Sequence, residues 1–86
     1  MSSTPEELQA ELCTLTQMTD TEWGDFFALT QEQQIQAVEN YRGQAWVQSS
    51  DTFGKVLAVL TVLATIAGAV SGISSAASAV AALKSI

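Results

Sequence analysis

The feature that most constrains this chain is a run of 28 residues, from Val56 to Leu83, without a single charged side chain. It begins with the strongly apolar "VLAVLTVLATIA" and continues into "GAVSGISSAASAV", where nearly every side chain is small. The run contains no proline, so the pattern predicts one helix over about residues 52–84. At about 1.5 Å per residue the run would measure roughly 42 Å, whereas a bilayer core of about 30 Å needs about 20 residues.

The predicted helix has two different faces. Large aliphatic side chains recur at alternating steps of three and four and form a ridge, made of Val59, Leu63, Ile66, Val70, Ile73, Ala77, Val80 and Leu83. Another side carries a ladder of small residues spaced by four, made of Ala64, Gly68, Gly72 and Ala76. Polar residues beside the ladder are Thr61, Thr65, Ser71, Ser75 and Ser78. Ladders of this kind allow close helix–helix packing, so we expect the four small residues to be contacts between copies of the chain.

Two surroundings explain a long helix without charges. In a bilayer, the ridge would meet acyl chains, while serine and threonine would bond across helices or to their own backbone carbonyls. In a large protein assembly, neighbouring subunits would bury the helix instead. A helix face in water normally carries Lys, Arg, Glu or Asp, and their absence favours burial on all sides. The pattern favours the bilayer and leaves the assembly as the alternative.

The N-terminal part contains three helix starts. Three capping boxes are formed by Thr4 with Glu7, Thr19 with Glu22 and Thr30 with Gln33. They predict helices over about 5–17 and 20–29, and a third helix from about residue 31. The third helix either ends at Gly43, a residue type that suits a C-terminal cap, or continues through Trp46 and Val47.

Aromatic side chains are concentrated in the same part. We expect a core of three short helices built from Trp23, Phe26, Phe27, Tyr41 and Trp46. In the third helix, the spacing predicts Ile35, Val38 and Tyr41 on the inner face.

A polar joint, "QSSDT" over residues 48–52, separates a cap at 1–47 from a hydrophobic Gly/Ala/Ser-rich helix at 53–86. Ser50 or Asp51 can cap that helix. Trp46 and Phe53 precede the apolar run directly and suit a membrane interface, where aromatic rings are enriched. Lys55 and Lys84 bracket the run and can extend to the headgroups. Because there is one lysine near each end, the distribution of positive charge does not predict which end of the helix would face the cytoplasm.

Charge divides the chain unevenly. All nine acidic residues lie within 1–52, where Arg42 is the only base, so that part has a net charge near −8. Residues 53–86 hold only two charges, those of Lys55 and Lys84. An acidic cap lacks the basic footprint of a nucleic-acid-binding protein, so we expect no such partner. The N-terminal residues have neither a basic nor an apolar leader region, so we also expect no cleaved signal peptide.

Few residues could carry chemistry. The chain has no histidine, and its one cysteine, Cys13, is expected to be a small apolar residue on a helix. A catalytic cysteine normally needs a histidine base. No metal-ligand spacing, phosphate loop or nucleophile elbow is present. We therefore expect no enzyme activity, no cofactor, no metal and no small-molecule substrate.

These observations predict an all-α fold with an acidic cap of three short helices followed by one long apolar helix. The layout resembles small phage membrane and virion proteins and tail-anchored proteins in general. The leading hypothesis is a membrane-associated structural protein that self-associates through its C-terminal helix as an anchor or channel component. One alternative is a subunit of a virion or secretion machine whose apolar helix is buried by its neighbours. Another is a pore-forming, toxin-like effector.

Overall fold

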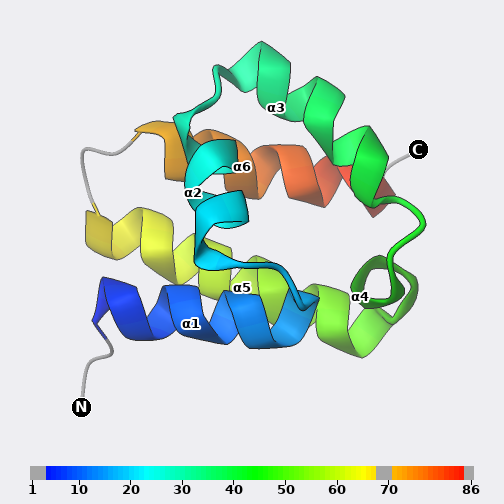
Figure 1. The fold of residues 1–86 in the computed structure, drawn as a ribbon, viewed down its shortest axis with the longest axis horizontal. Helices are drawn as coiled ribbons and strands as arrows, with labels where there is room; N and C mark the ends of the chain where they lie inside the picture. Colours follow the sequence, from blue (N-terminus) through cyan, green and yellow to red (C-terminus); the bar gives the residue numbers. More distant parts are fainter. Residues whose placement is uncertain (1–3, 68–70, 85–86) are drawn as a thin grey trace.

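The computed structural model describes residues 4–67 and 71–84, which form helices and their connections (Figure 1). The predicted all-α class is confirmed. The helices are α1 (Pro5–Thr16), α2 (Asp20–Ala28), α3 (Gln31–Ala37), α4 (Ala45–Gln48), α5 (Ser50–Ala67) and α6 (Ser71–Ala81). Two 3-10 segments, η1 (Val38–Tyr41) and η2 (Ala82–Lys84), extend α3 and α6.

All three predicted capping boxes are present at the starts of α1, α2 and α3. At α2, for example, the Thr19 hydroxyl accepts from the Glu22 amide at 3.1 Å, and the Glu22 carboxylate accepts from the Thr19 amide at 3.0 Å. Each box satisfies backbone donors that the first helical turn leaves unpaired. The start of each of these helices is therefore determined by local sequence.

The end of the third helix differs from both predicted alternatives. The α-helix stops at Ala37, η1 continues to Tyr41, and a separate turn of helix, α4, then places Trp46 and Val47 in the core. The polar joint is also shorter than predicted, because α5 begins at Ser50. The capping contact comes from Ser49, whose hydroxyl accepts from the Thr52 amide at 3.3 Å. Ser50 and Asp51 are instead part of α5.

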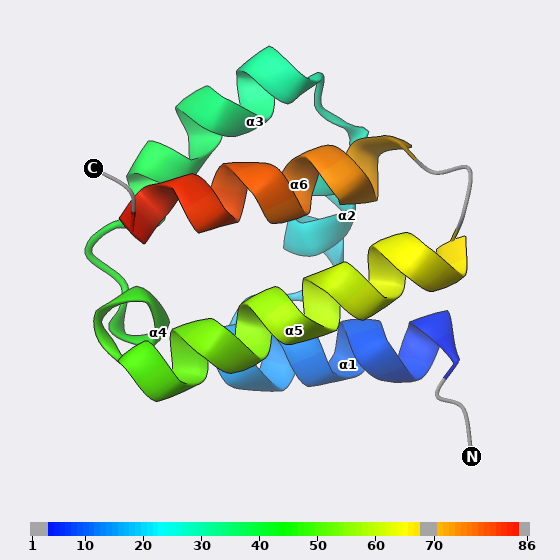
Figure 2. The same cartoon turned by 180° about the vertical axis from the view of Figure 1, so that it is seen from behind.

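The prediction of one long C-terminal helix is wrong. Helices α5 and α6 are separate, and they lie side by side in opposite directions (Figures 1 and 2). The longest dimension of the molecule is 34 Å, less than the roughly 42 Å that a continuous helix over the uncharged run would need. Folding back lets both segments bury aliphatic side chains that a straight helix would leave uncovered. Gly68 and Gly72 also lower helix propensity there by about 1 kcal/mol each relative to alanine.

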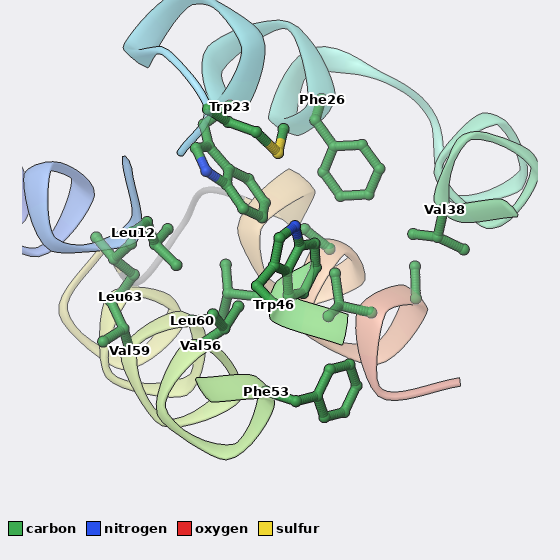
Figure 3. Close-up of a cluster of buried hydrophobic side chains, with 14 of the residues drawn as sticks. Leu12, Trp23, Phe26, Val38, Trp46, Phe53, Val56, Val59, Leu60 and Leu63 are labelled. Carbon is green, nitrogen blue, oxygen red and sulfur yellow. The ribbon is translucent and has the colours of Figure 1, made fainter. Parts of the chain in front are cut away.

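A single hydrophobic core draws on nearly every helix. Helix α5 lies between α1 and α6, while α2 and α3 pack against α6 (Figures 1 and 2). Figure 3 shows Trp23 and Phe26 from α2 and Trp46 from α4 directed toward the same interior as Val56 and Leu60 of α5. The two predicted parts, 1–47 and 53–86, thus share one core.

The expected aromatic cluster is confirmed around Trp23, which is fully buried. Its ring centroid lies 5.9 Å from that of Phe26, 5.6 Å from that of Phe27 and 6.4 Å from that of Trp46. The Trp23 indole N–H donates to the Thr16 hydroxyl at 3.0 Å, and that hydroxyl donates to the Leu12 carbonyl at 2.6 Å. The indole is therefore both packed and hydrogen-bonded, as a buried tryptophan requires.

Candidate interaction surface

Between Ala58 and Ile66, one side of α5 is exposed to solvent although it carries no charged residue; Lys55 is exposed one turn earlier. We call it the α5 outer face, which consists of Ala58, Thr61, Val62, Thr65 and Ile66. Val62 and Ile66 are 45% and 43% exposed, which is unusual for large aliphatic residues one helical turn apart. The opposite side of α5 contributes Val56, Leu60 and Leu63 to the core. The helix is therefore apolar on both sides, but only one side is covered by the rest of the chain.

The threonines on this face satisfy their hydroxyl groups within α5. Thr61 donates to the Leu57 carbonyl at 2.8 Å, and Thr65 donates to the Thr61 carbonyl at 3.0 Å. This is the bonding to the helix's own carbonyls that the sequence predicted as one possibility. Neither hydroxyl needs water as an acceptor, so covering this face would leave no unpaired threonine donor.

The other predicted polar positions are spread over α6. Ser71 begins that helix, Ser75 is partly buried and Ser78 is exposed. They do not join Thr61 and Thr65 on one continuous helix face, because α5 and α6 are separate antiparallel helices.

The ladder of small residues packs within the chain where the structure describes it. Ala76 is fully buried, Ala64 is partly buried against the core, and Gly68 lies outside the described residues. Gly72 meets the end of α2 so closely that a Cβ atom there would overlap the Phe27 carbonyl oxygen. Contact between copies through the ladder stays a prediction, whereas the described members pack against α2 and the shared core.

The aliphatic ridge is mostly an inner surface. Val59, Leu63, Ile73, Val80 and Leu83 are buried, and Ala77 is partly buried. Ile66 is the exception and belongs to the α5 outer face, while Val70 lies outside the described residues.

Sequence reasoning missed a buried amide that joins three helices. Gln34 in α3 is fully buried, and its side-chain nitrogen donates to the Phe26 carbonyl of α2 and the Gly72 carbonyl of α6, both at 2.9 Å. The expectation that Ile35 lies on the inner face is wrong, because Ile35 is 51% exposed. The Phe26 carbonyl also accepts from the Leu29 amide at 3.2 Å, so Gln34 adds a second donor to it and ties α2 to α6. One sequence signal could have indicated this burial. Gln34 lies four residues before the buried Val38, and residues four apart share one face of a helix.

The four possible membrane anchors meet at one end of the molecule. Trp46 and Phe53 are buried and stacked, with ring centroids 6.1 Å apart and planes 11° apart. The Lys84 ammonium lies 5.3 Å from the centroid of the Phe53 ring. Lys55 is exposed on the first turns of α5, near the same end. The two lysines therefore lie toward the same end of the molecule, although they bracket the uncharged run in the sequence.

The acidic side chains lie on the other helices. All nine carboxylates are exposed, eight of them on α1, α2, α3 and η1 and the ninth, that of Asp51, at the start of α5. Arg42 forms an ion pair with Glu39 at 3.1 Å. The surface thus divides into an acidic region and the uncharged α5 outer face.

Cys13 lies beside one of these carboxylates. Its thiol donates to Asp20 at 3.2 Å, which a purely apolar role would not include. Burial, followed by the hydrogen bond and the negative charge of Asp20, raises the pKa of Cys13 to about 11. At neutral pH the group is a thiol, which is a weak nucleophile.

A pocket of about 270 Å³ lies between the end of α1 and α4, and its lining includes Thr16, Gln44 and Trp46. Two polar contacts in its lining are internal to the protein: the Trp46 indole donates to Gln44, and the Thr16 hydroxyl accepts from Trp23. Within residues 4–67 and 71–84, no three His, Cys, Asp or Glu side chains are grouped so as to hold a metal ion. In the same part of the chain, no helix combines the length and the apolarity needed to cross a bilayer.

Comparison of the chain with protein-family models, with curated proteins and with solved structures found no match.

Proposed function

We propose that this chain is a small, non-enzymatic assembly protein that self-associates through its C-terminal helical hairpin. The observation that carries the proposal is the α5 outer face, where Val62 and Ile66 are exposed in a surface without charges. Exposed apolar surface is stabilised when a partner covers it. Since Thr61 and Thr65 already bond internally, a dry contact would leave neither hydroxyl unpaired.

The contact we propose joins the α5 outer faces of two copies. Each copy has a net charge of −6, but its carboxylates lie mainly on α1 to α3 and η1. Most of the negative charge of both copies therefore lies outside such a contact. Alanine and threonine beside the two aliphatic residues also let the backbones of two helices approach. This function corresponds to a structural subunit of a larger assembly, such as a virion or a secretion machine.

The test is the molar mass of the purified chain in solution, measured by light scattering and sedimentation over a range of concentrations. The wild type should form oligomers, and the double variant Val62→Lys, Ile66→Lys should be monomeric while keeping its helical circular dichroism. Ile35→Lys is the matched control, because Ile35 is equally exposed but lies on α3. A monomeric wild type up to millimolar concentration, or a double variant that still assembles, would refute the proposal.

A lipid bilayer is the second candidate partner for the hairpin, as part of an anchor or pore. The observation in its favour is that Trp46, Phe53, Lys55 and Lys84 lie at one end. If α5 and α6 left the core and inserted their apolar sides into one leaflet, both lysines would extend to the headgroups of that leaflet. Flotation with phosphatidylcholine vesicles, followed by carbonate extraction, distinguishes the two partners, because only inserted protein stays with lipid.

A further inference from the structure

A second hollow lies between α2 and the α3–η1 segment. Its lining residues come from a part of the sequence that precedes the α5 outer face. Its volume is about 250 Å³, and it is lined by Glu22, Asp25, Phe26, Leu29, Ala37 and Tyr41. We call it the α2–η1 groove. Four of its six residues are apolar or aromatic, and the two carboxylates come from neighbouring turns of α2.

The apolar part of the groove is firmly supported. Phe26 is 2% exposed and Tyr41 is half-buried, and their ring centroids lie 5.7 Å apart. The Tyr41 ring also contacts Trp23 and Trp46, at 6.5 Å and 6.0 Å between centroids. The groove therefore rests on the aromatic core, so its shape does not depend on a mobile loop.

The two carboxylates have no cation beside them in the described part of the chain. One oxygen of Glu22 accepts from Thr19 in the capping box, and Asp25 accepts no hydrogen bond from residues 4–67 or 71–84. Asp25 also lies toward the C-terminal end of α2, where the helix dipole disfavours negative charge. Arg42 pairs with Glu39, and Lys84 lies over Phe53. Glu22 and Tyr41 line the same groove, and burial, followed by the negative charge of Glu22, raises the pKa of Tyr41.

We propose that the α2–η1 groove binds an arginine side chain, flanked by apolar residues, from a partner protein. The aliphatic stem of arginine fits the Phe26 and Leu29 side, while the guanidinium reaches Glu22 and Asp25. The Tyr41 ring provides a face on which a guanidinium can stack. The partner is a different protein, since this chain has only three basic residues and a net charge of −6. The inference is independent of the proposed self-association.

The probe is the peptide acetyl-Ala-Leu-Arg-Leu-Ala-amide, and its control is the same peptide with citrulline, which keeps the shape of arginine without its charge. Titration of the isotope-labelled full chain, followed by amide NMR shifts, should move the signals of Phe26, Leu29, Ala37 and Tyr41. The citrulline peptide should leave them unchanged, and raising the salt concentration should weaken binding of the arginine peptide. Equal binding of both peptides, or shifts centred on α1, would overturn the proposal.

Two matched variants localise the charge effect. Asp25→Asn should weaken peptide binding about three- to tenfold, the range expected for a partly exposed ion pair. Glu11→Gln removes the same charge from α1 and should leave the dissociation constant unchanged. Equal effects of the two variants would mean general attraction to an acidic surface and would overturn the proposal. A second copy of the chain as the occupant would also overturn the proposal. In that case the groove signals would shift as the protein concentration rises without peptide, and the variant Lys55→Gln would abolish this shift.

Discussion

The acidic helices α1 to α3 and the uncharged hairpin α5–α6 mark their outer surfaces in different ways. In α1 to α3, carboxylates lie outside and Leu12, Trp23 and Phe26 lie inside, so charge marks the outer surface. In α5, alanine, threonine, valine and isoleucine occupy the outer face, and valine and leucine occupy most of the inner face, so both faces lack charge there. The comparison teaches that a run without charges need not be buried on every side. A helix can be half covered by its own chain and leave its other half for a partner.

The largest expected effect tests whether the two regions form one folding unit. Trp23→Ala should lower the free energy of unfolding by about 3–5 kcal/mol, because it removes a fully buried ring and the bond to Thr16. Since the core is shared, α5–α6 should unfold together with α1–α4 in a single transition. Chemical denaturation followed by tryptophan fluorescence and by far-ultraviolet circular dichroism measures this. Two separate transitions would show that the regions are energetically independent.

The next prediction concerns the point where the hairpin meets α2. Gly72→Ala should destabilise the chain by about 3 kcal/mol, because the new methyl group would overlap the backbone of Phe27. The matched control is Gly54→Ala, since no atom lies within 4 Å of a Cβ built at Gly54 in α5. That control should instead stabilise the protein by about 0.5–1 kcal/mol through helix propensity. Thermal and urea unfolding of both variants should give opposite signs, and equal signs would contradict this packing.

A smaller effect is expected at the polar bridge between the regions. Gln34→Leu should cost about 2 kcal/mol, because the carbonyls of Phe26 and Gly72 would each lose a donor in a buried site. Gln36→Leu makes the same change at an exposed position of α3 and should alter stability by less than about 0.5 kcal/mol. Urea unfolding compares the pair. A neutral Gln34→Leu would mean that packing alone holds α6 against α2 and α3.

The last effect is a pH dependence in the acidic region, and it vanishes at neutral pH, where Cys13 is a thiol in both states. Because the folded-state pKa of Cys13 is raised from 9.0 to about 11, the thiol stabilises the fold fully below about pH 9. That contribution is lost as the pH rises through about 11, since the unfolded chain ionises first. At pH 8, iodoacetamide should modify the folded protein about a hundredfold more slowly than the unfolded chain. Asp20→Asn should speed the reaction severalfold without reaching the unfolded rate, because burial is the larger cause. Equal rates in folded and unfolded protein would contradict the raised pKa.

The outcomes at particular residues show which sequence signals were reliable. Thr4, Thr19 and Thr30 predicted their helix starts correctly, because a capping box needs only residues three apart. Trp23 was correctly expected in the core, since large aromatic rings gain most from burial. Ile35 was wrongly placed on the inner face and the buried Gln34 was missed, because hydrophobicity alone places isoleucine inside and glutamine outside. A buried glutamine is favourable when its amide can donate to carbonyls of distant helices, and local spacing does not contain that information.

The sequence by itself determined the helical class, three helix starts, the aromatic core and the separation of charge, because each depends on neighbouring residues or on composition. Only the tertiary structure decided that the uncharged run folds back as α5 and α6 and that Gly72 meets Phe27. It also decided that Lys84 lies over Phe53 and that Val62 and Ile66 stay exposed. The physical reason is that a helix without charged side chains forms its backbone hydrogen bonds within itself, whether water, lipid or protein surrounds it. What covers its side chains depends on the area that the rest of the chain can offer, and α1 to α3 cover one side of the hairpin only.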